Sequence, residues 1–272
     1  MPSAHLLAPE NRRVLERLAA RRSLLAFDFD GTLAPVVPDP ARAAMRAGTA
    51  RRLRAVAAIQ PCAVLSGRAL GDLKTRLHGV PLLALAGNHG AEIAWNGGRG
   101  AGRGRPRVGT DTMTVASARR VRTWRRALES EIGHLPGVFI EDKRLSLTVH
   151  YRRAPDAAAA ARAVRAAASR IGDARLIGGK FGLNLLPAGG ADKGAALRHV
   201  WRRVGVRGAL YVGDDATDED AFVLRGAGLI TVRVGRSPRT AAAFHLSRQR
   251  EIDDLLEVLL GLGRRPAPSP QA

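Results

Sequence analysis

The chain has 272 residues, 46% of them hydrophobic, which is enough to fill the core of one large domain or two modest ones and excludes disorder as the main state. Its formal net charge is +20, but 40 of the 44 basic residues are arginine and only 4% of all residues are aromatic, which favours solvated helix faces over a nucleic-acid surface. No apolar run approaches the roughly 18 residues of a membrane helix, and residues 1–13 lack the zones of a signal peptide.

Helical periodicity and apolar runs alternate over the first part of the chain. The spacing of Val14, Leu15 and Leu18 predicts a helix over 9–20, and the apolar run 24–29 predicts a fully buried strand. Further helices and strands are predicted, in alternation, at 41–58, 62–65, 69–77 and 82–86. This alternation indicates parallel strands joined by crossover helices. It stops at residues 96–109, a stretch rich in Gly and Arg that is typical of a domain boundary.

A different pattern follows the boundary. A helix is predicted near 115–133, and two strands at 138–143 and 145–151 lie too close together for a crossover helix, so they should form an antiparallel hairpin. A helix over 156–170 and two short strands within 174–186 complete an α+β unit.

The alternation then resumes. Helices and strands are predicted at 192–204, 209–212, from Thr217, at 229–234 and at 252–262. We therefore predict an α/β fold with a Rossmann-like parallel-sheet core made of residues 1–108 and 188–263, an inserted α+β unit at 109–187, and a disordered tail at 264–272.

The cysteine and histidine residues do not indicate a disulfide or a zinc site. Cys62 is the single cysteine, which excludes an intramolecular disulfide, and it lies within an apolar run, which favours a buried thiol. The histidines outside the motifs described below show no ligand-like spacing, so a zinc site is not expected. We expect a cytoplasmic monomer that does not contact a membrane.

Two carboxylates follow the first buried strand, in the sequence Asp28-Phe29-Asp30-Gly31-Thr32. Ligands bind at the carboxyl ends of parallel strands, and residues i and i+2 of a strand point the same way, so both carboxylates can reach one point beyond the sheet. A hard divalent cation would relieve their repulsion. The alternative is a cluster of turn and helix-cap residues, because Asp, Gly and Thr are ordinary turn residues.

Three more groups follow predicted strands or open predicted helices. Asp214 and the acids after it follow the strand 209–212, although acids there also suit a helix N-terminus. The segment Ser66-Gly67-Arg68 follows the strand 62–65, and Lys193 opens a helix. A hydroxyl, a helix N-terminus and a lysine bind phosphoryl oxygens. Each group alone could be a cap or a surface charge, but all of them should meet at one edge of the sheet.

These motifs resemble those of the haloacid dehalogenase superfamily and, within it, the trehalose-6-phosphate phosphatases. The matching blocks are DFDGTLAP, LSGR, GNHGAE, EDKRLSLTVHYR, DKGAAL and GDDATDEDAF, within residues 24–235. The resemblance implies a haloacid dehalogenase core with residues 109–187 as its cap domain. It also implies Mg²⁺-dependent hydrolysis of trehalose 6-phosphate, a small phosphorylated disaccharide, to trehalose and phosphate through an aspartyl phosphate.

The resemblance further implies a role for each site residue. Asp28 would attack phosphorus, Asp30 would protonate the departing sugar oxygen and then deprotonate water, and Ser66 and Lys193 would hold the phosphoryl group. The metal would be held or supported by Asp28, Asp30 (through its carbonyl), Asp214, Asp215 and Asp218. The substrate-binding residues would be Gly31, Thr32, Arg68, Asn88, His89, Glu92, Glu141, Lys143, Ser146 and His150.

The chain departs from the family pattern before Pro187, where Asn184 and Leu186 stand in place of an expected acid and arginine. This leaves open a phosphatase of another phosphosugar, such as sucrose phosphate, glucosylglycerol phosphate or a mannosyl- or glucosyl-phosphoglycerate. The charge of +20 leaves open a nucleic-acid-binding or regulatory protein on the same fold.

Overall fold

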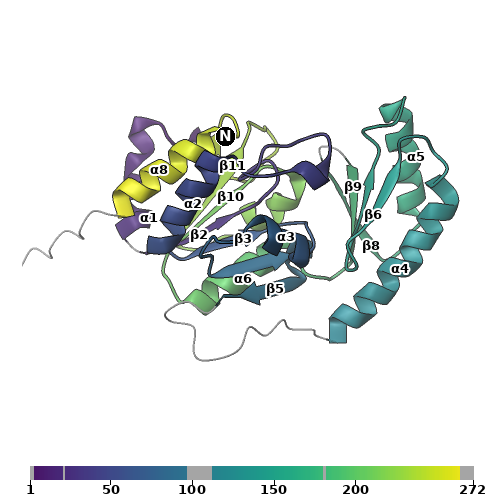
Figure 1. The fold of residues 1–272 in the computed structure, drawn as a ribbon, viewed down its shortest axis with the longest axis horizontal. Coiled ribbons are helices and arrows are strands. Elements are labelled where there is room, and N and C mark those ends of the chain that lie inside the picture. Colours follow the sequence, from purple (N-terminus) through teal and green to yellow (C-terminus); the bar gives the residue numbers. More distant parts are fainter. Residues whose placement is uncertain (1–2, 21, 97–111, 180–181, 264–272) are drawn as a thin grey trace, which may run out of the picture.

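The structure is a computed structural model that describes residues 3–20, 22–96, 112–179 and 182–263, with the backbone alone for 112–115. The predicted tail at 264–272 and residues 97–109 of the predicted boundary lie outside these ranges. Two sheets organise the chain, one of eight strands and one of four. Figure 1 shows them as two adjacent units, which we call the core unit (the larger sheet and its helices) and the cap unit (residues 112–187).

The core unit is built on a mostly parallel sheet. Its strand order is β1-β12-β11-β10-β2-β3-β4-β5, and only β5 runs antiparallel to its neighbour. The strands are β1 (Ala4–His5), β2 (Leu24–Phe27), β3 (Cys62–Leu65), β4 (Ala84–Gly87), β5 (Glu92–Trp95), β10 (Ala209–Gly213), β11 (Leu229–Val234) and β12 (Phe244–Leu246). All residues of the central strands β2, β3 and β10 are buried, which explains why their sequences are continuous apolar runs.

Helices cover both faces of this sheet. Leu25 and Phe27 of β2 pack with α1 (Arg12–Ala20), α2 (Ala47–Ile59), α3 (Leu70–Arg76) and α8 (Glu251–Gly263), whereas Leu24 and Ala26 face α6 (Lys193–Val204) and α7 (Glu219–Phe222). Single 3₁₀ turns lie at Pro9–Asn11, Pro40–Arg42, Asn88–Gly90 and Ala216–Asp218. Because successive residues of a strand point to opposite faces, each apolar run contributes side chains to two core clusters, one on each face of the sheet.

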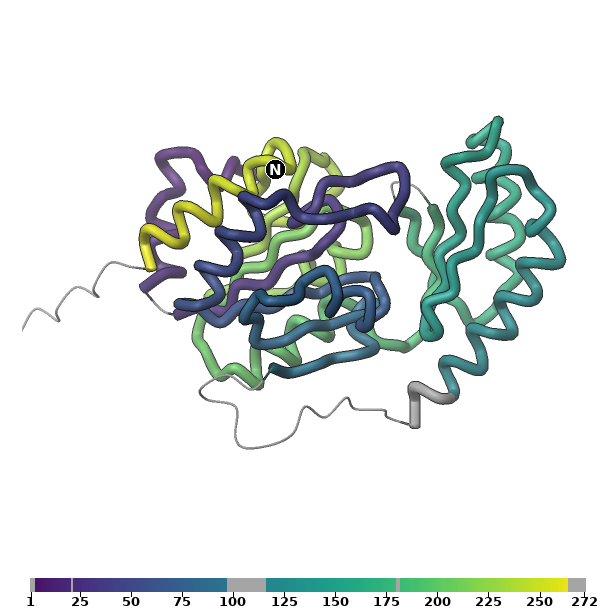
Figure 2. The backbone as a smooth tube through the Cα atoms, in the orientation of Figure 1, coloured from purple at the N-terminus to yellow at the C-terminus, as the bar shows by residue number. Residues whose placement is uncertain are grey.

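The cap unit has one apolar and one polar sheet face. Its strands β6 (Phe139–Asp142), β7 (Leu147–His150), β8 (Ala174–Gly178) and β9 (Gly182–Pro187) form an antiparallel sheet in the order β6-β7-β9-β8. Leu147 and Val149 pack against α4 (Thr112–Ile132) and α5 (Ala157–Ser169), which lie on the side away from the core unit (Figures 1 and 2). The polar residues that alternate with them therefore face the core unit.

The predicted α/β fold with an inserted α+β unit is confirmed, as is the antiparallel hairpin of β6 and β7. Three strands were not predicted: β1 and β12 are only two and three residues long, and β5 is a partly exposed edge strand of four residues. The helix predicted from Thr217 is a 3₁₀ turn followed by the four residues of α7. Cys62 is a buried free thiol, as expected. No helix among the described residues is long and apolar enough to cross a membrane.

The cap unit's stability depends partly on the N-cap of α5. The Asp156 carboxylate accepts a hydrogen bond from the Ala159 amide at 2.8 Å. Asp156→Ala should lower the free energy of unfolding by about 1 kcal/mol because that amide loses its partner. Thermal and urea denaturation followed by circular dichroism measure this. Asp156→Ser, which keeps an oxygen acceptor, is the matched control, and an equal loss in both variants would contradict the capping account.

Candidate active site

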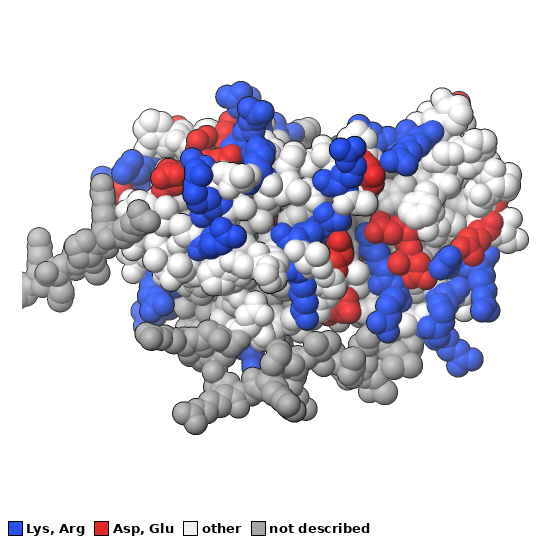
Figure 3. Space-filling model, in the orientation of Figure 1, with Lys and Arg blue, Asp and Glu red and all other residues white. Residues whose placement is uncertain are grey.

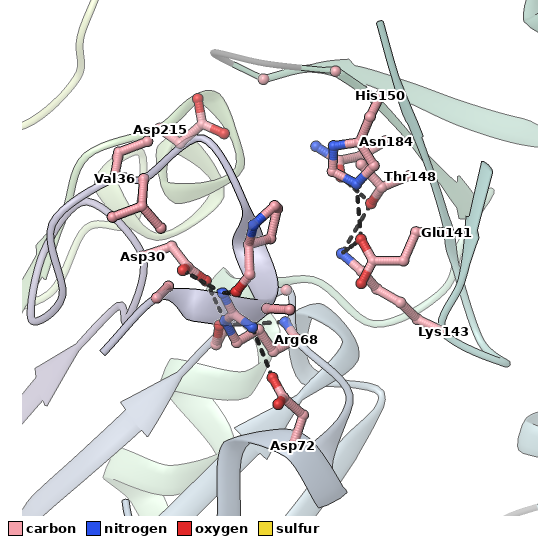
Figure 4. A pocket seen from close by; sticks show the side chains of 18 of the residues that line it. Asp30, Val36, Arg68, Asp72, Glu141, Lys143, Thr148, His150, Asn184 and Asp215 are labelled. Carbon is pink, nitrogen blue, oxygen red and sulfur yellow. Dashed lines mark hydrogen bonds and ion pairs between the residues drawn. The ribbon is translucent and has the colours of Figure 1, made fainter. Parts of the chain in front are cut away.

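A cavity of about 710 Å³ lies between the core and cap units. Its core side is lined by residues that follow β2, β3 and β10 or begin α6, because parallel strands end at the same edge of the sheet. These residues are Asp28, Asp30, Ser66, Lys193 and Asp214. Its cap side is lined by polar residues of β6, β7 and β9 and the turn after β6, namely Glu141, Lys143, Thr148, His150 and Asn184 (Figure 4). Segments far apart in the chain thus converge on one space.

Lys193 lies between two buried carboxylates on the core side. Its Nζ is 2.9 Å from Asp28 Oδ1 and 2.7 Å from Asp218 Oδ1, and all three side chains are almost fully buried. Burial alone would lower the pKa of Lys193, but Asp218 and Asp28 outweigh it and hold this pKa above its ordinary value. The amine is therefore a fixed positive charge at the end of the sheet.

Asp218 is fully engaged by neighbouring donors. Besides Lys193, its Oδ1 accepts a hydrogen bond from the Tyr211 hydroxyl at 2.6 Å, and its Oδ2 accepts from the backbone amides of Asp214 and Asp215 at 2.8 and 2.9 Å. These contacts fix the Asp214-Asp215 backbone and keep the pKa of Asp218 below its ordinary value despite burial. Tyr211 was not predicted as a site residue, although a buried tyrosine hydroxyl within an apolar strand needs a partner.

The residues at this edge fit a divalent metal ion. One carboxylate oxygen from each of Asp28, Asp214 and Asp218 lies within 4.8 Å of the others. Burial, and then the carboxylates of Asp218 and Asp214, raise the pKa of Asp28 against the opposing effect of Lys193. A hard cation with oxygen ligands would relieve this repulsion. The absence of a side chain at Gly31 leaves room for the Asp214 carboxylate, because a Cβ there would lie 2.1 Å from Asp214 Oδ2.

The Asp30 side chain belongs to a second ionic group rather than to this carboxylate cluster. It forms a bidentate pair with Arg68, with Nε to Oδ2 at 2.6 Å and Nη2 to Oδ1 at 2.7 Å. Arg68 also donates to Asp72 at 2.8 Å and lies over the Phe29 ring, 5.5 Å from its centroid. Asp28 and Asp30 both line the cavity, but Asp28 pairs with Lys193. The pair of Asp30 with Arg68 is seen in Figure 4.

The cap side carries a hydrogen-bonded polar network. Glu141 accepts a hydrogen bond from His150 Nε2 at 2.9 Å and lies 3.6 Å from Lys143 Nζ, which donates to Thr148 Oγ1 at 2.9 Å. Thr148 in turn donates to Asn184 Oδ1 at 2.8 Å. Burial raises the pKa of Glu141, but His150 and Lys143 outweigh it and keep the carboxylate ionised. This mixture of donors and acceptors suits a ligand with hydroxyl groups.

His89 is a buried polar side chain whose two ring nitrogens find no hydrogen-bond partner among the described residues. It lines the cavity and packs so closely on Gly67 that a Cβ there would lie 2.5 Å from its Cε1. Both Asn88 and His89 have left-handed backbone angles, with φ of 49° and 56°. Burial, and then the charges of Lys143 and Lys193, keep the pKa of His89 well below its ordinary value. A neutral imidazole has one donor nitrogen and one acceptor nitrogen, so it can bind two different hydroxyl groups.

Other predicted site residues lie beside the cavity without lining it. Ser146 of the cap unit donates to Asn88 Oδ1 at 3.3 Å, and Asn88 donates to Glu92 Oε2 at 2.5 Å, so these three form a contact between the two units. Thr32 is fully buried, and its carbonyl accepts from Gln249 at 2.7 Å. Sequence reasoning missed Thr148 as a lining residue, although it alternates with core residues on its strand.

Comparisons with known proteins agree on one family. The model of the family described as trehalose-phosphatase matches residues 26–236. The trehalose-phosphate phosphatase of Mycobacterium avium (strain 104) is 40% identical over 212 residues, which are 75% of this chain and 52% of that protein. That of Mycobacterium marinum is 35% identical over 243 residues, covering 84% and 59%. The chain thus spans only part of the length of these relatives.

Solved structures give the same fold. The C-terminal domain of the Candida albicans trehalose-6-phosphate phosphatase has a TM-score of 0.74 and 24% identity, covering 96% of this chain and 98% of that one. A trehalose-6-phosphate phosphatase related protein has a TM-score of 0.67 and 27% identity, covering 89% and 98%. The parallel-sheet core with its inserted cap is therefore the haloacid dehalogenase type predicted from the motifs.

Gly31 is expected to be required for the carboxylate cluster. Its φ is +80°, and an added Cβ would displace Asp214. Gly31→Ala should lower the free energy of unfolding by about 1–3 kcal/mol and abolish binding of a divalent cation, measured by denaturation and calorimetric titration. Gly189→Ala is the matched control, since Gly189 has a φ of +70° with no atom within 4 Å of a built Cβ. Equal effects of the two changes would contradict the proposed contact.

Asp72 should make folding depend on pH. Its burial raises its pKa, but hydrogen bonds from Arg76 and Arg68 outweigh this and lower the pKa below its ordinary value. Because the folded-state pKa is depressed, the stabilisation is present above about pH 4, the unfolded value, and is lost as the pH falls. Melting temperatures of the parent and Asp72→Asn measured against pH should differ most near neutrality and converge below about pH 4. A difference that does not change with pH would contradict this assignment.

Proposed function

The chain belongs to the trehalose-phosphatase family, and we propose that it hydrolyses trehalose 6-phosphate to trehalose and inorganic phosphate. The observation that carries the proposal is the two-sided cavity. Its core side has buried carboxylates and a buried lysine, and its cap side has a network of polar side chains. The first surface suits a phosphate ester with a metal ion, and the second suits a neutral sugar.

Asp28 is the proposed nucleophile. One of its carboxylate oxygens forms a bond to phosphorus while the bond from phosphorus to the sugar oxygen breaks, which gives an aspartyl phosphate. Lys193, 2.9 Å from Asp28 Oδ1, and the buried Ser66 hydroxyl hold the phosphoryl oxygens on which charge develops. Water then attacks phosphorus, the bond to Asp28 breaks, and phosphate leaves.

Asp30 is the proposed general acid and base. It protonates the departing sugar oxygen and later removes a proton from the attacking water. In the structure its two oxygens accept hydrogen bonds from Arg68, so proton transfer requires the side chain to turn from Arg68 toward the ester oxygen. Both residues line the cavity, and Arg68 keeps a second carboxylate partner in Asp72.

Mg²⁺ is the proposed metal, held by Asp28, Asp214 and the backbone carbonyl of Asp30. Asp215 and Asp218 support the site in this proposal, because the oxygens of Asp218 already bind Lys193, Tyr211 and two backbone amides. When bound, the ion neutralises charge on the phosphoryl oxygens. The Asp218 contacts hold the Asp214 backbone in place at the end of β10.

The sugar is proposed to contact Glu141, Lys143 and His150 from the cap and His89 from the core. These side chains line the cavity and include both donors and acceptors. The remaining predicted substrate residues act indirectly in this proposal, by shaping the loop after β2, holding Asp30 or joining the two units; they are Gly31, Thr32, Arg68, Asn88, Glu92 and Ser146. Residues 109–187 are the proposed cap domain, and we propose a cytoplasmic location.

Asn184 favours one second candidate, a phosphatase of another phosphosugar. It lines the cavity and accepts a hydrogen bond from Thr148, where the family pattern leads us to expect an acid. The test compares kcat/KM for phosphate release among trehalose 6-phosphate, sucrose phosphate, glucosylglycerol phosphate and glucosyl-phosphoglycerate. The highest value is expected for trehalose 6-phosphate. A nucleic-acid-binding role gains no support from the face in Figure 3, where basic and acidic side chains are interspersed.

Asp28→Asn should abolish hydrolysis of trehalose 6-phosphate, because a neutral amide cannot form the aspartyl phosphate. The expected loss in kcat is about a thousandfold or more, measured by phosphate release in the presence of Mg²⁺. Asp254→Asn makes the same change at an exposed position of α8 and serves as the control. Hydrolysis by Asp28→Asn at the parent rate would contradict the proposed mechanism.

A further inference from the structure

Large hydrophobic side chains are exposed at three described positions, and two of them face the cavity. Phe139 is 62% exposed, Val223 54% and Val36 39%. Phe139 lines the cavity from the cap side and Val36 from the core side, whereas Val223 is not among the lining residues. Exposed apolar groups that line a cavity otherwise rich in polar side chains indicate a ligand with apolar as well as polar surface.

Phe139 contacts an aromatic neighbour across the sheet. It pairs with His150 in the register of β6 and β7, and the two rings are stacked with centroids 6.1 Å apart and an interplanar angle of 21°. His150 is itself fixed, because its Nε2 donates to Glu141 at 2.9 Å. The Phe139 ring therefore lies beside an anchored imidazole, and it is largely exposed at the edge of the cavity that it lines.

The ring also lies next to the polar groups of the cap. Phe139 and Glu141 are two residues apart on β6, so they lie on the same sheet face about 7 Å apart along the strand. Glu141, His150 and Lys143 supply acceptors and donors beside the apolar ring. A pyranose with equatorial hydroxyls has this combination of surfaces, since its hydroxyls point outward around the ring and its axial C–H groups form apolar faces.

We propose that Phe139, supported by His150, is a stacking platform for the sugar ring of the substrate that does not carry the phosphate. The inference rests on the proposed function, in which the phosphate and the sugar ring that carries it lie near Asp28 and Lys193 in the core unit. Phe139 stands on β6, the edge strand of the cap sheet, and reaches the cavity from the opposite side. It thus discriminates a phosphorylated disaccharide from a phosphorylated monosaccharide.

The test compares two substrates that share the phosphate and the first ring. Phe139→Ala should raise KM for trehalose 6-phosphate about three- to tenfold with little change in kcat, whereas Phe139→Trp should keep the parent KM. Glucose 6-phosphate lacks the second ring, so its KM, or its inhibition constant against trehalose 6-phosphate, should be the same in the parent and Phe139→Ala. Val223→Ala, at an exposed position away from the cavity, should change neither value.

The outcomes separate this inference from the function on which it rests. A parent that hydrolyses trehalose 6-phosphate, with an unchanged KM in Phe139→Ala, overturns the stacking platform alone. An equal rise in KM, or in the inhibition constant, for both substrates also overturns the stacking platform, because that result indicates a general disturbance of the cap. A parent that leaves trehalose 6-phosphate intact overturns the proposed function and the platform together. Circular dichroism melts of the variants establish that each is folded under the assay conditions.

Discussion

The buried ion group of Lys193, Asp28 and Asp218 is the constraint on which the site depends. Charged groups this deeply buried are stable only when each is paired and hydrogen-bonded. Lys193 pairs with both carboxylates, and Asp218 completes its contacts with Tyr211 and two amides of the chain after β10. The ends of β2 and β10 and the start of α6 are thereby fixed relative to one another. The proposed nucleophile, the fixed positive charge and the carboxylates proposed to hold the metal therefore form one structural unit.

The two faces of the cap sheet explain how the second half of the site arises. Leu147 and Val149 must be buried against α4 and α5, and the strand period then directs Thr148 and His150 to the other face. Since that face meets the core unit, its polar groups close the cavity opposite Asp28 and Lys193. The two units thus present different surface chemistry to one cavity, which supports the proposal that a phosphate ester and a polyhydroxylated sugar bind there together.

Much of the core and its site could be predicted from the sequence, because Asp28, Ser66 and Asp214 directly follow apolar runs and Lys193 opens a helix. The partner of Asp30 could not be predicted, since the Arg68 pair depends on how two loops after neighbouring strands approach each other. Tyr211 and Phe139 lie in predicted strands, and nothing in the sequence pattern distinguishes them from the other residues of those strands. The structure differs from that pattern in two ways, because the Tyr211 hydroxyl is buried against Asp218 and the Phe139 ring is exposed, and periodicity predicts neither.

The proposed function depends on phosphorylation of Asp28, which Lys193 contacts, during turnover. Mass spectrometry of the enzyme after acid quench, during hydrolysis of trehalose 6-phosphate in the presence of Mg²⁺, tests this most directly. One added phosphoryl group is expected on the peptide that contains Asp28, and hydroxylamine, which cleaves acyl phosphates, should release it. A phosphoryl group on another residue, or rapid turnover with no phosphorylated enzyme at any quench time, would contradict it.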